Sequence, residues 1–141
     1  MNKKYWLKYI DDTAHPGIRV QADSKGDLFT RAAWGMFSLM TDMNTVNSEH
    51  KTVLAVKGVN LSSLMVNWLT QLNALHTSGQ RLFSKFEIQE MSQIYLKAEA
   101  ASEAMDSDRH VIDTGIKAVS SDDLEVEYVD GTWHAQIRFE V

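Results

Sequence analysis

The sequence predicts an α+β fold in which two helices pack on a mostly antiparallel β-sheet. Two long segments repeat apolar residues at helical spacing, and each follows a residue that can cap a helix. About eight shorter segments either alternate apolar and polar residues or are rich in branched and aromatic side chains, which is typical of strands. Helices laid on an antiparallel sheet are the arrangement that such a set of elements favours.

The first part of the chain predicts two strands followed by a helix. Residues 5–10 and 17–22 have strand character, and residues 11–16 form the turn between them. Ser24, with Asp27 three residues later, resembles a capping box in which Asp replaces the usual Glu. The apolar stripe that follows is expected to face the core. Its members are Leu28, Ala32, Met36, Leu39, Met40 and Met43.

The middle of the chain predicts a buried strand and a second helix. Residues 51–58 place apolar side chains on both faces of a strand. Asn60 can cap the helix that follows, and Gly79 can end it. We interpret Trp68 as a core anchor, because it lies within the apolar stripe of this helix. The stripe consists of Leu61, Leu64, Met65, Trp68, Leu69, Leu72 and Leu75.

The rest of the chain predicts strands almost throughout. A polar stretch, residues 102–109, is predicted to be a loop. Asp130-Gly131 is a strong hairpin signal, because both turn positions need positive φ. The segments with strand character are 82–90, 94–101, 111–119, 124–129 and 132–141.

Composition limits the classes of protein to consider. The 141 residues suit one domain over residues 1–141, and the absence of cysteine excludes disulfides, thiolate metal sites and cysteine nucleophiles. No apolar run approaches the roughly 20 residues needed to span a membrane, and residues 5–8 are too polar for a signal peptide, so we expect a cytoplasmic protein. With a net charge of −5 and one adjacent basic pair, direct tight binding of nucleic acid is not expected.

Several short motifs follow one another in a characteristic order. They are Thr13-Ala14 with Gly17-Ile18, Met36 to Asp42, Asn67-Trp68-Leu69, Leu82 to Phe86, Asp106 to His110, Ile116 to Val119 and Leu124 to Val126. In order and spacing they resemble the archease family. The resemblance implies a helper protein whose partner is an RtcB-type RNA ligase, acting in tRNA splicing or RNA repair.

The resemblance also implies a divalent metal site, usually described with calcium in this family. Its ligands would be His15, Glu140 and the backbone of Val141, with Asp12 and Asp122 adding carboxylates if the first turn approaches the last hairpin. The family usually has His at positions 12 and 122 and Asp at positions 15 and 140. Calcium prefers oxygen ligands, whereas the imidazole nitrogen of His15 suits a transition metal.

Simpler interpretations of the same residues stay open. Asp12 can be an ordinary turn residue, because Asp side chains bond their own backbone in turns. His15 precedes Pro16, which favours an extended conformation, and it can simply complete the turn. Glu140 lies on a strand face that water can cover. Lys117, which the resemblance assigns to contact with the partner, can be an exposed strand lysine.

Three functions are compatible with these features. The first is the ligase accessory factor, without catalysis of its own. The second is a general chaperone-like modulator of RNA-modifying enzymes, which needs no metal. The third is a small metal-dependent enzyme that uses the His/carboxylate cluster. The chain has no Gly-rich phosphate loop, nucleophile elbow, HExxH motif or paired-cysteine zinc motif that would favour another enzyme class. No membrane association is expected.

Overall fold

The structure is a computed structural model that describes residues 4–122 and 124–141. The helices in these residues are α1 (Lys25–Met40), the 3-10 helix η1 (Met43–Thr45) and α2 (Leu61–Gly79). The strands are β1 (Leu7–Ile10), β2 (Gly17–Ala22), β3 (His50–Lys57), β4 (Arg81–Met91), β5 (Tyr95–Ala104), β6 (Ala118–Val119), β7 (Glu125–Val129) and β8 (Thr132–Glu140). None of the helices in this part of the chain is long and apolar enough to cross a membrane.

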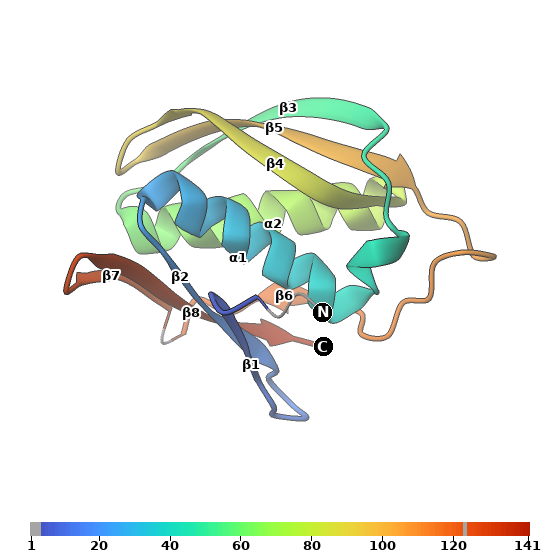
Figure 1. The fold of residues 1–141 in the computed structure, drawn as a ribbon, viewed down its shortest axis with the longest axis horizontal. Coiled ribbons are helices and arrows are strands. Elements are labelled where there is room, and N and C mark those ends of the chain that lie inside the picture. Colours follow the sequence, from blue (N-terminus) through green and yellow to red (C-terminus); the bar gives the residue numbers. More distant parts are fainter. Residues whose placement is uncertain (1–3, 123) are drawn as a thin grey trace.

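The two α-helices lie between two antiparallel sheets (Figure 1). One sheet has the strand order β1-β2-β8-β6, and β7 also pairs with β8. The other has the order β3-β5-β4. The predicted α+β class with two helices on antiparallel strands is therefore confirmed, and the strands divide into two sheets that cover both sides of the helix pair.

Both helices begin where the sequence predicts. The Ser24 hydroxyl accepts a hydrogen bond from the Asp27 amide at 3.1 Å, which caps α1. At α2, the Asn60 side chain accepts from the Ser63 amide, and the Ser63 hydroxyl accepts from the Asn60 amide, which completes a capping box. The helix ends at the predicted glycine, and the next residue, Gln80, takes the left-handed conformation with φ 53°.

The core lies between the helices and the sheets. Met36 and Met40 of α1 are fully buried, so the methionine stripe faces the core as predicted. Met43 lies outside the helix, in η1. Trp68 is fully buried, and its indole Nε1 donates to the Phe29 carbonyl oxygen at 2.9 Å. This bond joins the two helices directly, so the interpretation of Trp68 as a core anchor is confirmed.

The predicted loop over residues 102–109 is wrong in its first part. Strand β5 continues to Ala104, and both Ser102 and Glu103 are buried in it. The polar character of this stretch suggested solvent exposure. A buried carboxylate is stable here because Arg109 and other donors bind it, as described below.

The predicted strand over residues 111–119 is also wrong, because only its last two residues pair in a sheet. The preceding segment is attached to the end of α1 instead. The Thr41 hydroxyl donates to the Val111 carbonyl, and the Asp113 amide donates to the Met40 carbonyl, both at 2.7 Å. Tertiary hydrogen bonds to a helix end have therefore replaced the sheet ladder that the apolar alternation suggested.

Candidate functional site

The turn over residues 11–16 packs against β8. The Phe139 amide donates to the Pro16 carbonyl oxygen at 2.8 Å. A Cβ atom on Gly17 would lie only 2.4 Å from the Ile137 carbonyl oxygen, so only glycine allows the two backbones to come this close. The first turn and the last strand consequently form one surface. The predicted site requires these two segments to lie close together.

Asp12 holds this turn together. Its Oδ1 accepts hydrogen bonds from the amides of Ala14 at 3.0 Å and His15 at 3.2 Å. Arg138 Nη1 lies 3.4 Å from Asp12 Oδ2 and donates to the His15 carbonyl oxygen at 3.1 Å. The amide of His15, then that of Ala14, and to a smaller degree the Arg138 guanidinium, lower the pKa of the Asp12 carboxyl. Asp12 is thus a turn residue paired with an arginine.

Lys117 and Glu140 are joined through their backbones on the other side of β8. The Lys117 amide donates to the Glu140 carbonyl oxygen at 2.7 Å, and Ala118 pairs with Glu140 in the ladder between β6 and β8. The side chains of Glu140 and Val141 are exposed, and Glu140 makes no ion pair within residues 4–122 and 124–141. The structure therefore places Lys117 directly beside the predicted C-terminal ligands.

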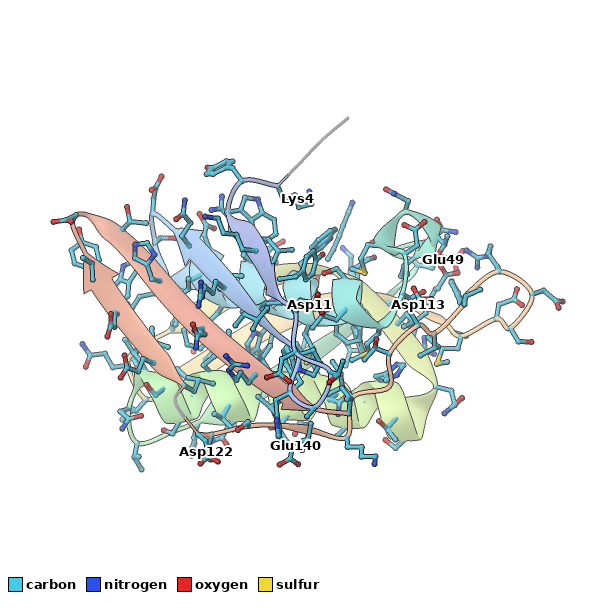
Figure 2. The ribbon with its side chains drawn as sticks, turned by 90° about the horizontal axis from the view of Figure 1, so that it is seen from below. Lys4, Asp11, Glu49, Asp113, Asp122 and Glu140 are labelled. Atoms are coloured by element: carbon cyan, nitrogen blue, oxygen red, sulfur yellow. The ribbon has the colours of Figure 1, made fainter. Side chains whose placement is uncertain are left out.

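Asp122 lies in the turn that follows β6. The Ser120 amide donates to the Arg138 carbonyl oxygen at 2.9 Å, and the Asp122 amide donates to the Ser120 hydroxyl at 3.2 Å. Figure 2 shows Asp122 and Glu140 along the same edge of the molecule, with Asp11 nearer its centre. The exposed Asp122 carboxylate lies on the same side as Glu140, and no contact joins the two side chains.

No three side chains of the predicted donor set converge in this arrangement. Residues 4–122 and 124–141 contain no group of three or more His, Asp or Glu side chains that could hold one. The Asp12 carboxylate already binds two amides and the Arg138 guanidinium. A guanidinium at this position repels a second cation.

A carboxylate with more hydrogen bonds than Asp12 lies elsewhere, and no pattern in the sequence predicts it. Glu103, 2% exposed, binds Arg109 through two nitrogens, one of them at 3.0 Å. Its Oε2 also accepts from the Asn47 amide at 2.5 Å and from His110 Nε2 at 3.1 Å. Because the Asp106 amide donates to His110 Nδ1, the imidazole hydrogen lies on Nε2.

These bonds, with Arg109 contributing most, lower the pKa of Glu103 to about 2 although burial opposes the charged form. Arg109 Nη1 and His110 Nε2 also lie at 2.9 and 3.1 Å from the Thr45 carbonyl oxygen. The cluster therefore ties the end of η1 and the residues after it to β5 and to the loop that follows β5. His110 belongs to a motif that the sequence singles out, but the sequence predicts that its partner Glu103 lies in a loop.

Comparison with known proteins identifies the class. The model of the Archease protein family (MTH1598/TM1083) matches residues 7–141, nearly the whole described chain. This chain therefore belongs to the archease family, and the resemblance seen in its motifs is confirmed.

Individual relatives agree with this assignment. Protein archease of Methanopyrus kandleri is 35% identical over 130 residues, covering 90% of this chain and 93% of that protein. Protein archease of Pyrococcus abyssi is 33% identical, covering 95% of this chain and 96% of its own length. The solution structure of Methanobacterium thermoautotrophicum protein 1598 superimposes with a TM-score of 0.84 at 25% identity, covering 96% of this chain and 99% of that one.

A crystal structure from Thermotoga maritima, described as an archease and possible chaperone, has a TM-score of 0.62 at 14% identity and covers all of this chain and 98% of its own. At this identity the likeness concerns the fold alone. The sheet–helix–sheet arrangement is thus shared by both solved structures.

Proposed function

We propose that this chain is an accessory protein for an RtcB-type RNA ligase in tRNA splicing or RNA repair. One observation carries the proposal beyond family membership. The first turn and the C-terminal strand, which contain the residues that the family resemblance singles out, are joined into one surface through Arg138. Lys117 and Glu140 belong to the same surface because their backbones are bonded to each other.

The chemistry of this surface suits contact with a basic enzyme. Glu140 and Asp122 present exposed carboxylates. The cations on this surface are Lys117, bonded to Glu140 through the backbone, and Arg138, which is paired with Asp12. The chain as a whole carries a net charge of −5, which favours fast association with a positively charged partner surface. Carboxylates held on a strand end and a short turn can be inserted into a ligase cleft, where they would assist guanylylation or metal loading.

The test uses the ligase from the same genome. Added protein is expected to raise both ligase guanylylation and multiple-turnover ligation, and Glu140→Gln is expected to reduce the stimulation about tenfold, equivalent to ~1.4 kcal/mol. Glu127→Gln removes an exposed acid of β7 that lies opposite His134, six residues before Glu140 in β8; it is the matched control and should stimulate fully. Unchanged ligase rates with the wild-type protein would refute the proposal.

Metal binding has a separate test, because the ligase proposal does not depend on it. The metal-free protein is titrated with Ca²⁺, Mn²⁺ and Zn²⁺ by calorimetry beside Glu140→Ala. Because Arg138 is paired with Asp12, we expect weak binding at most. Tight binding that disappears in Glu140→Ala would instead support the predicted site, and a preference for Zn²⁺ would identify His15 as a ligand.

The two alternative functions have weaker support. The description of the Thermotoga maritima protein as a possible chaperone favours a chaperone-like modulator. Suppression of aggregation of an RNA-modifying methyltransferase at stoichiometric ratio would support it. The metal-dependent enzyme needs a His/carboxylate cluster, which the described residues do not form. Activity retained in Glu140→Ala would remove that alternative.

A further inference from the structure

A groove of about 660 Å³ opens between α1, β1 and the start of β4, and η1 lies at one end of it. The side chains that line it include Lys4, Tyr9, Trp34, Ser38, Asp42 and Lys85. Lys4 lies on the opposite side of the molecule from Asp122 and Glu140 (Figure 2). The groove is therefore separate from the surface proposed to contact a ligase.

Two tryptophans hold a lysine at the rim of this groove. Lys4 Nζ lies 4.8 Å from the centre of the Trp34 ring and 5.6 Å from that of Trp6. The two rings meet edge to face at 5.8 Å, and Arg31 lies 5.1 Å from the Trp6 ring. Cation–π contacts order an ammonium group without neutralising it. The position of Lys4 is thus fixed while its charge is still available to an anion.

The groove is positively charged although the protein is acidic. Within residues 4–122 and 124–141, neither Lys4 nor Lys85 forms an ion pair with a carboxylate. The acid among the lining residues is Asp42, whose Oδ1 accepts from the Asn44 amide at 3.0 Å and caps η1. Two unpaired lysines therefore outweigh one carboxylate that already has a structural partner, and the groove favours an anionic ligand.

An aromatic side chain in the same groove is both fixed and accessible. Tyr9 is 54% exposed, and its hydroxyl is hydrogen-bonded to the Ser38 hydroxyl at 2.8 Å. Ser38 itself donates to the Gly35 carbonyl oxygen at 2.6 Å, so the phenol is the donor in the first bond. The ring is held at its tip while much of its surface is open to solvent. Such a ring is a stacking platform for a flat ligand.

We propose that this groove binds a nucleotide, with the base stacked on Tyr9 and the phosphate between Lys4 and Lys85. A base and a phosphate are the two halves of one ligand that match an ordered aromatic ring beside unpaired cations. The same chemistry is offered by a free nucleotide and by the terminal nucleotide of an RNA strand. Composition argues against RNA binding because the basic residues are scattered in the sequence. Folding, however, brings Lys4 and Lys85 to the same groove.

The test is a set of calorimetric titrations without any ligase, with tryptophan fluorescence as a second readout because Trp34 lines the groove. The probes are AMP, ATP, a six-nucleotide single-stranded RNA and inorganic pyrophosphate. Wild-type protein is expected to bind the nucleotide probes more weakly as salt rises. Lys85→Ala and Tyr9→Ala should each weaken binding about tenfold. Lys57→Ala removes an exposed lysine outside the groove and should leave binding unchanged.

The outcomes of these titrations identify the ligand of the groove or overturn the proposal. Tighter binding of RNA than of ATP assigns the groove to a strand end, and similar or stronger binding of the mononucleotides assigns it to a free nucleotide. Pyrophosphate binding as tightly as ATP would overturn the role of the base. No binding at millimolar nucleotide, or equal losses in Lys85→Ala and Lys57→Ala, would overturn the proposal. Ligase stimulation by Lys85→Ala is measured separately. If the variant stimulates the ligase and nucleotide binding is absent, this site fails while the proposed function holds.

Discussion

Replacing Glu103 by Gln tests the buried polar cluster, because it removes the charge and keeps the size of the side chain. The cluster lowers the pKa of Glu103 from 4.5 to about 2. At ~1.36 kcal/mol for each pKa unit, the charged form is stabilised by about 3 kcal/mol. Arg109 is 40% exposed, so solvent screens part of this interaction. We therefore expect Glu103→Gln to lower the free energy of unfolding by about 2 kcal/mol at pH 7.

The effect has a defined pH dependence. A carboxyl group whose pKa is lower in the folded state contributes its full stability above its unfolded pKa, here 4.5. That contribution is lost as the pH falls toward about 2, where the folded carboxylate is protonated. The difference in unfolding free energy between wild type and Glu103→Gln should thus be constant from pH 7 to 5 and shrink below pH 4.5. Urea denaturation at several pH values measures it.

A control on the same strand separates this cluster from ordinary surface charge. Glu99 pairs at 3.5 Å with Lys51, whose side chain is 72% exposed, so Glu99→Gln should cost well under 1 kcal/mol. The melting temperature of Glu103→Gln should fall by roughly 3 °C per kcal/mol, so by about 6 °C. Equal effects of the two substitutions at pH 7, or a Glu103→Gln effect that persists unchanged at pH 2.5, would refute the reasoning.

Two further substitutions test the turn over residues 11–16. Gly17→Ala should destabilise the protein by about 2 kcal/mol in thermal denaturation, because the new Cβ meets the Ile137 carbonyl oxygen at 2.4 Å; Gly115→Ala, with nothing within 4 Å of its Cβ, should be near neutral. Arg138→Met should raise the pKa of the Asp12 carboxyl in an NMR titration, but only partly, since the turn amides lower it more than Arg138 does. A complete return to 3.8 would contradict this order of causes.

Local signals explain why the helices were predicted closely. Ser24 and Asn60 act within four residues of themselves, so their capping bonds follow from sequence alone. The strand over residues 17–22 is likewise set by local alternation, and its bounds agree with the structure. Where a segment's partners are near in sequence, the chain carries enough information to place it.

Distant contacts explain the errors. The apolar residues of segment 111–119 suggest a ladder, but the hydrogen bonds that hold the start of the segment come from Thr41 and Met40 at the far end of α1. The sequence predicts a loop at Glu103, because no sequence pattern shows that the Asn47 amide, 56 residues away, and Arg109 will bind this carboxylate inside the fold. Hydrogen bonds between residues that are far apart in the sequence leave no periodic signal in it.

The candidate site depends both on local signals and on contacts between residues that are distant in the sequence. The sequence allowed Asp12 to be either a turn residue or a metal ligand, and the register of β2 against β8 settles its contacts by placing Arg138 beside it. With this arginine the turn has a cation that belongs to the chain itself, bonded to the Asp12 carboxylate and the His15 carbonyl oxygen. Metal binding contributes to stability only when the metal is bound, whereas this contact forms with the fold. If it replaces a metal ion at this turn, chelators should leave the protein's stability unchanged and Arg138→Met should lower it.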